Sequence, residues 1–129
     1  MKIPITAERF TPLPAGCYRV KVVSVRGVQW EPYGWALEWE FEVVEGPYAG
    51  CLVRGHTNLH NATGPRQKFG RWYYALTGTR TQLGDAVETD DLIHKTCWAQ
   101  IEQRVTRRGK PGNTIELIPG RPDAATHSP

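Results

Sequence analysis

The fold of this chain is decided by the stretch Trp35-Ala36-Leu37-Glu38-Trp39-Glu40-Phe41-Glu42-Val43. Apolar residues alternate here with glutamates, and a period of two is typical of a β-strand with one face in a core and the other in water. The residues predicted on the buried face are Trp35, Leu37, Trp39, Phe41 and Val43. The glutamates are expected to form the solvent face of the same strand.

A second strand is predicted directly after this one. Residues 45–50 concentrate turn formers, because Pro47 fixes φ and the glycines on either side of it tolerate positive φ. An extended apolar pattern resumes at Cys51. The chain is therefore expected to double back as a hairpin over residues 35–59.

A long first strand is predicted upstream, over residues 17–28. Its apolar residues alternate with polar ones but change face after the Val22-Val23 pair, and a β-bulge near Val22 accounts for such a switch. A long, bent first strand is also what a small barrel requires. Residues 27–34 are expected to form the loop to the next strand.

One amphipathic helix of about three turns is predicted after the hairpin, because apolar residues recur there at i, i+3, i+4 and i+7. These residues are Phe69, Trp72, Tyr73 and Leu76. Asn61 or Thr63 is placed to cap the start of the helix, and Pro65 suits its first turn. Gly78 is placed to end it in a left-handed conformation.

The remaining segments predict a second hairpin and two terminal extensions. Residues 96–106 and 113–118 have strand patterns and flank a basic turn, and residues 90–93 are expected to form a single helical turn. Residues 1–15 are expected to form an N-terminal arm. Residues 119–129, with three prolines, are expected to be a disordered tail.

The order of the predicted elements is three strands, one helix and two strands, which is the order of the five-stranded OB barrel. We therefore expect a mainly β single domain over residues 16–118, closed into an OB-like barrel with the helix between strands three and four. Closure would remove exposed strand edges and let the helix plug one end. An open antiparallel sheet with one helix is the alternative.

The cysteines and the hydropathy of the chain bear on its compartment. Cys17, Cys51 and Cys97 each begin a predicted strand and none belongs to a CxxC pair, so we expect small buried hydrophobic residues. No apolar run approaches the roughly 20 residues needed to cross a bilayer, and the first residues do not resemble a signal peptide. A cytoplasmic protein with no membrane partner is expected.

No catalytic motif is present. Residues 64–70 lack the spacing and the hydroxyl of a phosphate-binding loop, and neither GxSxG nor HExxH occurs. His56 and His60 would lie about 13 Å apart along a strand, too far to share a metal ion. We therefore expect a protein that is not an enzyme and uses no cofactor or metal.

Charge is unevenly distributed along the chain. The formal net charge is only +3, but residues 31–50 contain five glutamates and no basic residue, while residues 51–80 contain five basic residues and no acidic one. A folded molecule with such blocks can present a basic stripe beside an acidic one.

Two predicted loops point to a binding surface. In an OB barrel the loop between strands one and two and the loop between strands four and five flank one groove, where nucleic acid commonly lies. The residues expected to bind it are Trp30 and Tyr33 in the first loop, Arg107, Arg108 and Lys110 in the second, and Arg19, Lys21 and Arg54 on the strands. Aromatic rings stack bases and cations contact phosphates, so sequence-tolerant binding of single-stranded DNA is predicted, with RNA as a second ligand.

Four segments within residues 14–118 together resemble a known group of proteins. They are Pro14-Ala15-Gly16-Cys17-Tyr18-Arg19-Val20, the stretch from Leu37 to Gly50, Ala75-Leu76-Thr77-Gly78, and Asp91-Leu92-Ile93. The combination resembles small phage and prophage proteins described as single-stranded-DNA-binding or recombination-associated. The resemblance implies an accessory factor of DNA replication or recombination that coats exposed strands in a bacterial host cell. His94 stands where the resemblance predicts glycine, and the tail lacks the acidic tip with which many such proteins recruit partners.

Two other functions stay open. A protein-interaction or assembly module without nucleic-acid binding is favoured if Glu38, Glu40 and Glu42 stand clear of basic residues. We expect instead that Arg19 and Lys21 pair with them across the strands and neutralise them. Carbohydrate binding rests only on the many aromatic residues. Replication or recombination proteins are the expected protein partners, and the sequence does not decide between a monomer and a homo-oligomer.

Overall fold

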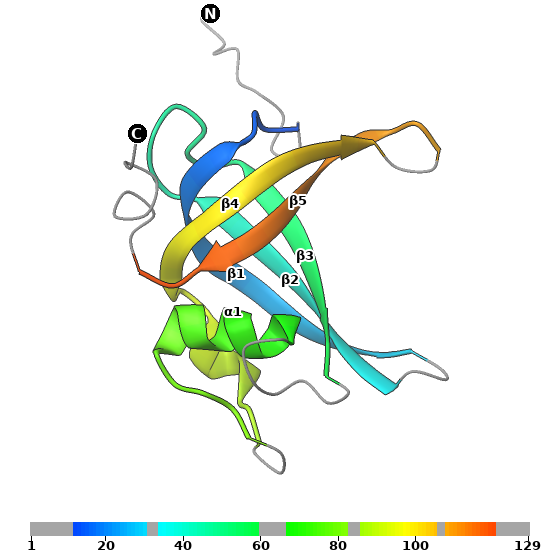
Figure 1. Ribbon diagram of the computed structural model, residues 1–129, viewed down its shortest axis with the longest axis vertical. Helices are drawn as coiled ribbons and strands as arrows, with labels where there is room; N and C mark the ends of the chain where they lie inside the picture. Colours follow the sequence, from blue (N-terminus) through cyan, green and yellow to red (C-terminus); the bar gives the residue numbers. More distant parts are fainter. Residues whose placement is uncertain (1–11, 31–33, 60–66, 83–85, 106–107, 121–129) are drawn as a thin grey trace, which may run out of the picture.

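The computed structural model describes residues 12–30, 34–59, 67–82, 86–105 and 108–120, and they form a five-stranded antiparallel sheet with one helix (Figure 1). The strands are β1 (Gly16–Trp30), β2 (Gly34–Val43), β3 (Leu52–Asn58), β4 (Thr96–Val105) and β5 (Pro111–Ile118). The helix α1 (Lys68–Thr77) and a 3-10 turn η1 (Thr89–Leu92) lie between β3 and β4. The predicted mainly β fold and its element order are confirmed.

Strand β1 is shared by both halves of the sheet, whose order is β3-β2-β1-β4-β5. Its first part, Gly16 to Lys21, pairs with β4, and its second part, Val20 to Trp30, pairs with β2. The register shifts between Val22 and Ser24, so the predicted bulge is confirmed. The prediction of a loop from residue 27 is wrong, because β1 remains paired with β2 as far as Trp30.

The β2–β3 hairpin follows the predicted alternation except at the start of β2, where Trp35 is exposed and Ala36 is buried. Leu37, Trp39, Phe41 and Val43 are buried, and Gly46 and Gly50 take positive φ in the turn. Trp35, predicted in the core, is instead 54% exposed. It lies near the free end of the β1–β2 hairpin, where its indole covers Gly27 rather than entering the core.

Aromatic side chains form the centre of the core. Trp39 stacks on Phe41 with ring centroids 5.7 Å apart, and the edge of Trp72 from α1 meets both rings. The indole N–H of Trp39 donates to the Thr57 hydroxyl at 2.9 Å, and both groups are buried. This bond gives a buried donor its partner.

Helix α1 is shorter at its start than predicted. Its N-cap is Gln67, whose side chain makes no capping bond. Asn61, Thr63 and Pro65, which were predicted to cap the helix and form its first turn, lie outside the described residues. The predicted end is confirmed, because Gly78 has φ 74° and its N–H donates to the Tyr74 carbonyl. Phe69 and Trp72 face the core as expected.

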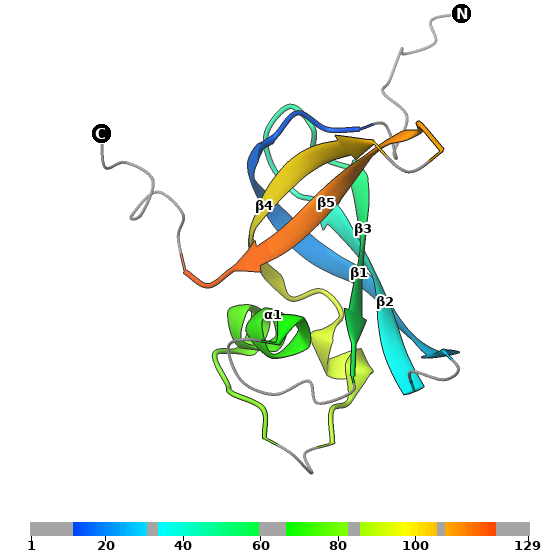
Figure 2. The ribbon, with the colours of Figure 1, turned by 45° about the vertical axis from the view of Figure 1, so that its right-hand side comes forward.

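The sheet is not closed into a barrel, contrary to the prediction. Strands β3 and β5 are its two edges, and α1 lies across one end of the sheet (Figure 2). A Cβ atom on Gly55 of β3 would lie 2.5 Å from the ring of Trp72 and 3.2 Å from Ile115 of β5. The indole therefore lies directly over Gly55 of one edge strand, and Ile115 of the other edge strand lies close to the same point.

The structure tests the predictions for the three cysteines and for position 94. Cys51 and Cys97 are buried as predicted, but Cys17 is exposed and donates to the Gln100 side chain, because odd-numbered residues at the start of β1 face away from the core. His94 has φ 71°, in the left-handed region that favours glycine. The expectation of glycine at position 94 therefore corresponds to a real backbone requirement.

The end of the N-terminal arm is anchored in the core. Leu13 is 1% exposed, and its N–H donates to the Asn113 side-chain oxygen at 2.8 Å. Its carbonyl accepts from the side chains of Gln103 and Asn113, each at 3.0 Å. These bonds fix the arm to the β4–β5 hairpin near its turn.

Candidate nucleic-acid interface

A groove of about 940 Å³ lies between the face of the β1–β2–β3 strands, the start of α1 and the β4–β5 hairpin. In Figure 1 and Figure 2 the β1–β2 and β4–β5 hairpins project on the same side of the molecule, one below and one above this region. The lining residues are Ser24, Arg26, Glu38, Trp39, Glu40, Arg54, Gly55, His56, Lys68, Arg104, Asn113, Thr114 and Ile115. Most of these are polar, with Trp39 and Ile115 in the floor.

Antiparallel register brings cations and carboxylates together on the strand side of the groove. Arg26 lies opposite Glu38 and pairs with its carboxylate, and Arg54 lies opposite Glu40, with 3.7 Å between Nε and Oε2. The two arginine side chains are 74% and 72% exposed. Both guanidinium groups therefore face solvent while each holds a glutamate.

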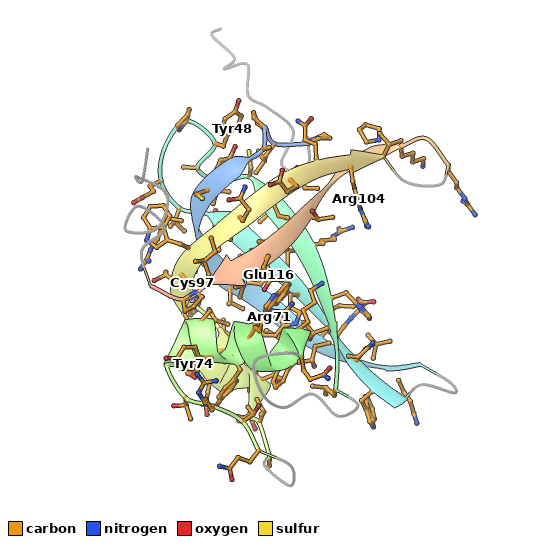
Figure 3. All side chains as sticks on the ribbon, in the orientation of Figure 1. Tyr48, Arg71, Tyr74, Cys97, Arg104 and Glu116 are labelled. Atoms are coloured by element: carbon orange, nitrogen blue, oxygen red, sulfur yellow. The ribbon has the colours of Figure 1, made fainter. Side chains whose placement is uncertain are left out.

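A second group of charges lies where α1 meets β5. Arg71 donates two hydrogen bonds to the Glu116 carboxylate, from Nε at 3.0 Å and from Nη2 at 3.2 Å. Figure 3 shows the two side chains pointing toward each other. The ammonium of Lys68 lies 4.9 Å from the centre of the Trp72 ring. Burial lowers the pKa of Lys68, Glu116 raises it, and Arg71 and Arg104 lower it further. The net effect is a lowered pKa in surroundings rich in positive charge.

Glu38, Glu40 and Glu42, the acidic row of β2, have other partners than predicted. Lys21 pairs with Glu42 at 3.6 Å, which agrees with the expectation, but Arg19 does not reach the row. Arg19 donates to the Thr96 hydroxyl at 2.8 Å and lies over the Trp98 ring, because it stands opposite Trp98 in the ladder of β1 with β4. The prediction that Arg19 neutralises the glutamates is therefore wrong.

The glutamates also do not form a face clear of the groove. Glu38 and Glu40 line it, with Arg26 and Arg54 as their partners. The groove lining thus contains four cations, Arg26, Arg54, Lys68 and Arg104, against these two carboxylates. Its formal charge is positive, although less so than a row of basic residues alone would give.

The predicted binding residues are dispersed by the fold. Of the five whose side chains the structure describes, only Arg54 lines the groove. Arg108 and Lys110 are exposed beyond Arg104 at the β4–β5 turn, and neither is among the described lining residues. Arg19 and Lys21 lie on the first part of β1, which pairs with β4. Trp30 ends β1 with its backbone paired to Gly34, whereas its side chain, Tyr33 and Arg107 lie outside the described residues.

Three groove cations were missed by the sequence argument. Arg26 is brought opposite Glu38 only by the register that follows the bulge. Lys68 is in the first turn of α1, and its polar position on an amphipathic helix reads as a solvated face. Arg104 lies two residues before the basic turn, and that turn was the only signal in the sequence that pointed near it.

No group of three or more His, Cys, Asp or Glu among the described residues is arranged to hold a metal ion. No helix in the described part of the chain is long and apolar enough to cross a membrane. A smaller hollow on another face is lined in part by Arg19, Trp98 and Ile118.

The chain matches a known protein family. The family model described as "Protein of unknown function (DUF669)" matches residues 5–124, which is most of the chain. No curated protein matches it.

Proposed function

The chain belongs to the DUF669 family, and we propose that it is a sequence-tolerant single-stranded-DNA-binding protein. The role we propose is that of an accessory factor in DNA replication or recombination, of phage origin and acting in the cytoplasm of a bacterial host cell. The proposal rests on a five-stranded antiparallel sheet that is left open between β3 and β5, and we infer that this sheet is related to the OB fold.

The observation that carries the proposal is the basic groove between the two projecting hairpins. Four cations line it from three separate parts of the fold: β1 and β3, the start of α1, and β4. Each phosphate that a cation contacts releases a counterion, so such a groove suits a polyanion that lies along it. A groove on this side of a five-stranded sheet is also where OB folds commonly bind single strands.

Duplex DNA is not the ligand we propose. Among the described residues the groove has no projecting helix to enter a major groove, since α1 packs its Phe69 and Trp72 into the core. A single strand can bend to follow a short groove and offers unstacked bases to aromatic side chains. Trp30 and Tyr33, in or beside the β1–β2 connection, are the residues we propose for stacking.

The test is a fluorescence titration of labelled oligo-dT, oligo-rU and a matching duplex at two salt concentrations. We expect oligo-dT to bind, the affinity to fall as salt rises, and the duplex to bind more weakly. Arg104→Gln should lower the affinity for oligo-dT about fivefold at about 0.1 M salt, which corresponds to the removal of one phosphate contact. Arg80→Gln is the matched control, because Arg80 lies over Tyr74 outside the groove.

Stacking and phosphate binding leave different signatures. Trp30→Ala should cost roughly 1 to 3 kcal/mol of binding free energy with an unchanged salt dependence. Replacing Arg107 and Arg108 by alanine should flatten the slope of log K against log salt by about 0.7 for each phosphate that is no longer neutralised. A wild-type protein that does not bind oligo-dT at low salt, or that binds duplex equally well, would contradict the proposal.

The second candidate is a protein-interaction or assembly module, and the observation in its favour is the presence of Glu38 and Glu40 in the groove. Alternating Arg and Glu side chains, each exposed on one side, complement a partner protein with the same mixed pattern. Co-purification of a bacterial or phage protein that is lost in Glu40→Lys, together with no binding of oligo-dT, would favour this function.

A further inference from the structure

The groove has two walls of different charge. We call Arg26, Glu38, Glu40 and Arg54, all on β1 to β3, the sheet wall. Lys68 of α1 and Arg104 of β4, backed by the Arg71–Glu116 pair, form the helix wall. Both walls line the same groove, so a ligand that fills it meets both.

The sheet wall is close to neutral. Arg26 is held by Glu38 and Arg54 by Glu40, in pairs whose carboxylates are 42% and 27% exposed. A phosphate that approached either arginine would also approach a glutamate, and the repulsion would offset much of the attraction. The sheet wall is therefore a poor surface for the backbone of a nucleic acid.

The helix wall has surplus positive charge. Lys68 and Arg104 line the groove together, and Arg71 and Arg104 both lower the pKa of Lys68. Among the described residues, Glu116 is the only carboxylate that shifts this pKa. Both oxygens of Glu116 already accept from Arg71. An anion beside Lys68 and Arg104 would relieve their mutual repulsion, and the lowered pKa of Lys68 is consistent with such repulsion together with partial burial.

We propose that a bound single strand lies with its phosphates along the helix wall and its bases toward the sheet wall, and that the sheet wall favours bases with an exocyclic amino group over thymine. This inference rests on the proposed function. It specifies which wall of the groove the phosphates and the bases of the bound strand face, and which class of base is preferred.

The preference follows from the acceptors on the sheet wall. A carboxylate has about four lone-pair positions, so a glutamate that pairs with one arginine keeps capacity to accept from a donor on the ligand. The amino group of cytosine or adenine is such a donor, and glutamate accepts from the cytosine amino group in known modes of base recognition. Thymine presents a carbonyl oxygen at the corresponding place, which a carboxylate repels.

The first test maps the phosphates. Lys68→Gln and Arg104→Gln should each lower affinity about fivefold at about 0.1 M salt and flatten the salt slope by about 0.7, for oligo-dC and oligo-dT alike. Arg26→Gln and Arg54→Gln should flatten the slope much less. The reverse order, with the slope controlled by Arg26 and Arg54, would overturn the proposal.

The second test concerns the bases, with oligo-dC and oligo-dT of equal length compared at pH 8. We expect wild type to bind oligo-dC at least about fivefold more tightly, the discrimination of one good hydrogen bond to a base edge. Glu38→Gln should bring the two affinities toward equality, because an amide can donate to thymine as well as accept from cytosine. Glu45→Gln, outside the groove, is the matched control.

Failure of this inference differs from failure of the proposed function. If wild type binds neither oligonucleotide, the proposed function is wrong and the inference falls with it. If wild type binds both equally well and Glu38→Gln changes nothing, only the inference is wrong. A thermal melt of each variant shows whether it is folded, and the comparison of two ligands on one folded variant does not depend on its stability.

Discussion

Gly55 of β3 and Trp72 of α1 are in such close contact that glycine is the only residue that fits opposite the indole. A Cβ atom at position 55 would lie 2.5 Å and 2.9 Å from two carbon atoms of the Trp72 ring. Trp72 is completely buried against Trp39 and Phe41 and cannot move aside without disturbing both. This contact joins the helix to the edge of the sheet at the floor of the groove.

Gly55→Ala is therefore expected to destabilise the fold by about 1 to 3 kcal/mol, the usual cost of overpacking a core. Urea denaturation followed by circular dichroism measures the change. Gly112→Ala is the matched control, because a Cβ atom at Gly112 of β5 meets nothing within 4 Å. Equal stability of the two variants would show that the indole has room to shift.

His94→Gly is expected to stabilise the protein by about 1 kcal/mol. The position has φ 71°, a conformation that costs a residue with a Cβ atom roughly 1 to 2 kcal/mol and costs glycine almost nothing. Part of this gain is offset because glycine loses more conformational entropy than histidine on folding. His94→Asn should gain less, since asparagine tolerates this region better than most residues. Thermal melts compare the three proteins, and a lower melting temperature for His94→Gly would contradict the argument.

Lys68→Met is expected to stabilise the free protein at pH 7 while it weakens binding of single strands. Partial burial and the nearby arginines lower the pKa of Lys68 below its ordinary 10.5, so the folded state binds this proton less tightly than the unfolded state does. Protonated Lys68 thus destabilises the fold below its folded pKa, and the penalty disappears as pH rises toward 10.5.

The measurement for Lys68 is the difference in melting temperature between wild type and Lys68→Met across pH 7 to about 10.5, where it should shrink. Lys95→Met, between η1 and β4, provides a comparison outside the charged cluster. A difference that grows with pH would have the wrong sign for a lowered pKa.

Glu40→Lys is expected to tighten binding of oligo-dT and to steepen its salt dependence by about 0.7 for each additional phosphate that is neutralised. The substitution removes a carboxylate from the groove, adds a cation there and releases Arg54 from its partner. The sequence alone predicts little change, because it pairs the glutamates with Arg19 and Lys21 and so makes them nearly neutral for binding. Glu45→Lys adds the same charge elsewhere and should have a much smaller effect.

Only Cys17 is expected to react quickly with a thiol reagent at pH 8. It is exposed, whereas Cys51 and Cys97 are buried and burial raises the pKa of Cys97 to about 12, although Arg19 lowers it somewhat. The thiolate is the reactive form, and at pH 8 such a pKa leaves about one Cys97 in ten thousand ionised. Counting thiols with Ellman's reagent should give one in native protein and three in denaturant.

Much of the fold could be predicted because it depends on local patterns. The alternation through Leu37, Trp39 and Phe41, the bulge at Val22 and the glycine end of α1 each leave a signal within a few residues. The closed barrel was predicted wrongly because closure requires β3 and β5 to pair, and these strands are far apart in the sequence with α1 between them. Trp35 continues the apolar period but lies past the end of the core, and periodicity does not show where a core ends.

The candidate site was less predictable, because cross-strand register decides which charges meet. The sequence offers several basic partners for Glu38 and Glu40, and the alternation of the first strand favours Arg19 and Lys21. The bulge instead aligns Arg26 with Glu38, and the β2–β3 turn aligns Arg54 with Glu40. Lys68 and Arg104 join them only through tertiary packing, which no period in the sequence records.

The double pairing of β1 has a consequence for the order in which the molecule folds. The ladders from β1 through β2 to β3 join residues close in sequence, so this three-stranded unit can form early. The ladder of β1 with β4 must instead close a long loop, as shown by the Arg19 and Thr96 side chains, which bond although they are 77 residues apart. Docking of the β4–β5 hairpin is therefore expected to be the slow step, and it also completes the groove, so DNA-binding competence should appear last during refolding.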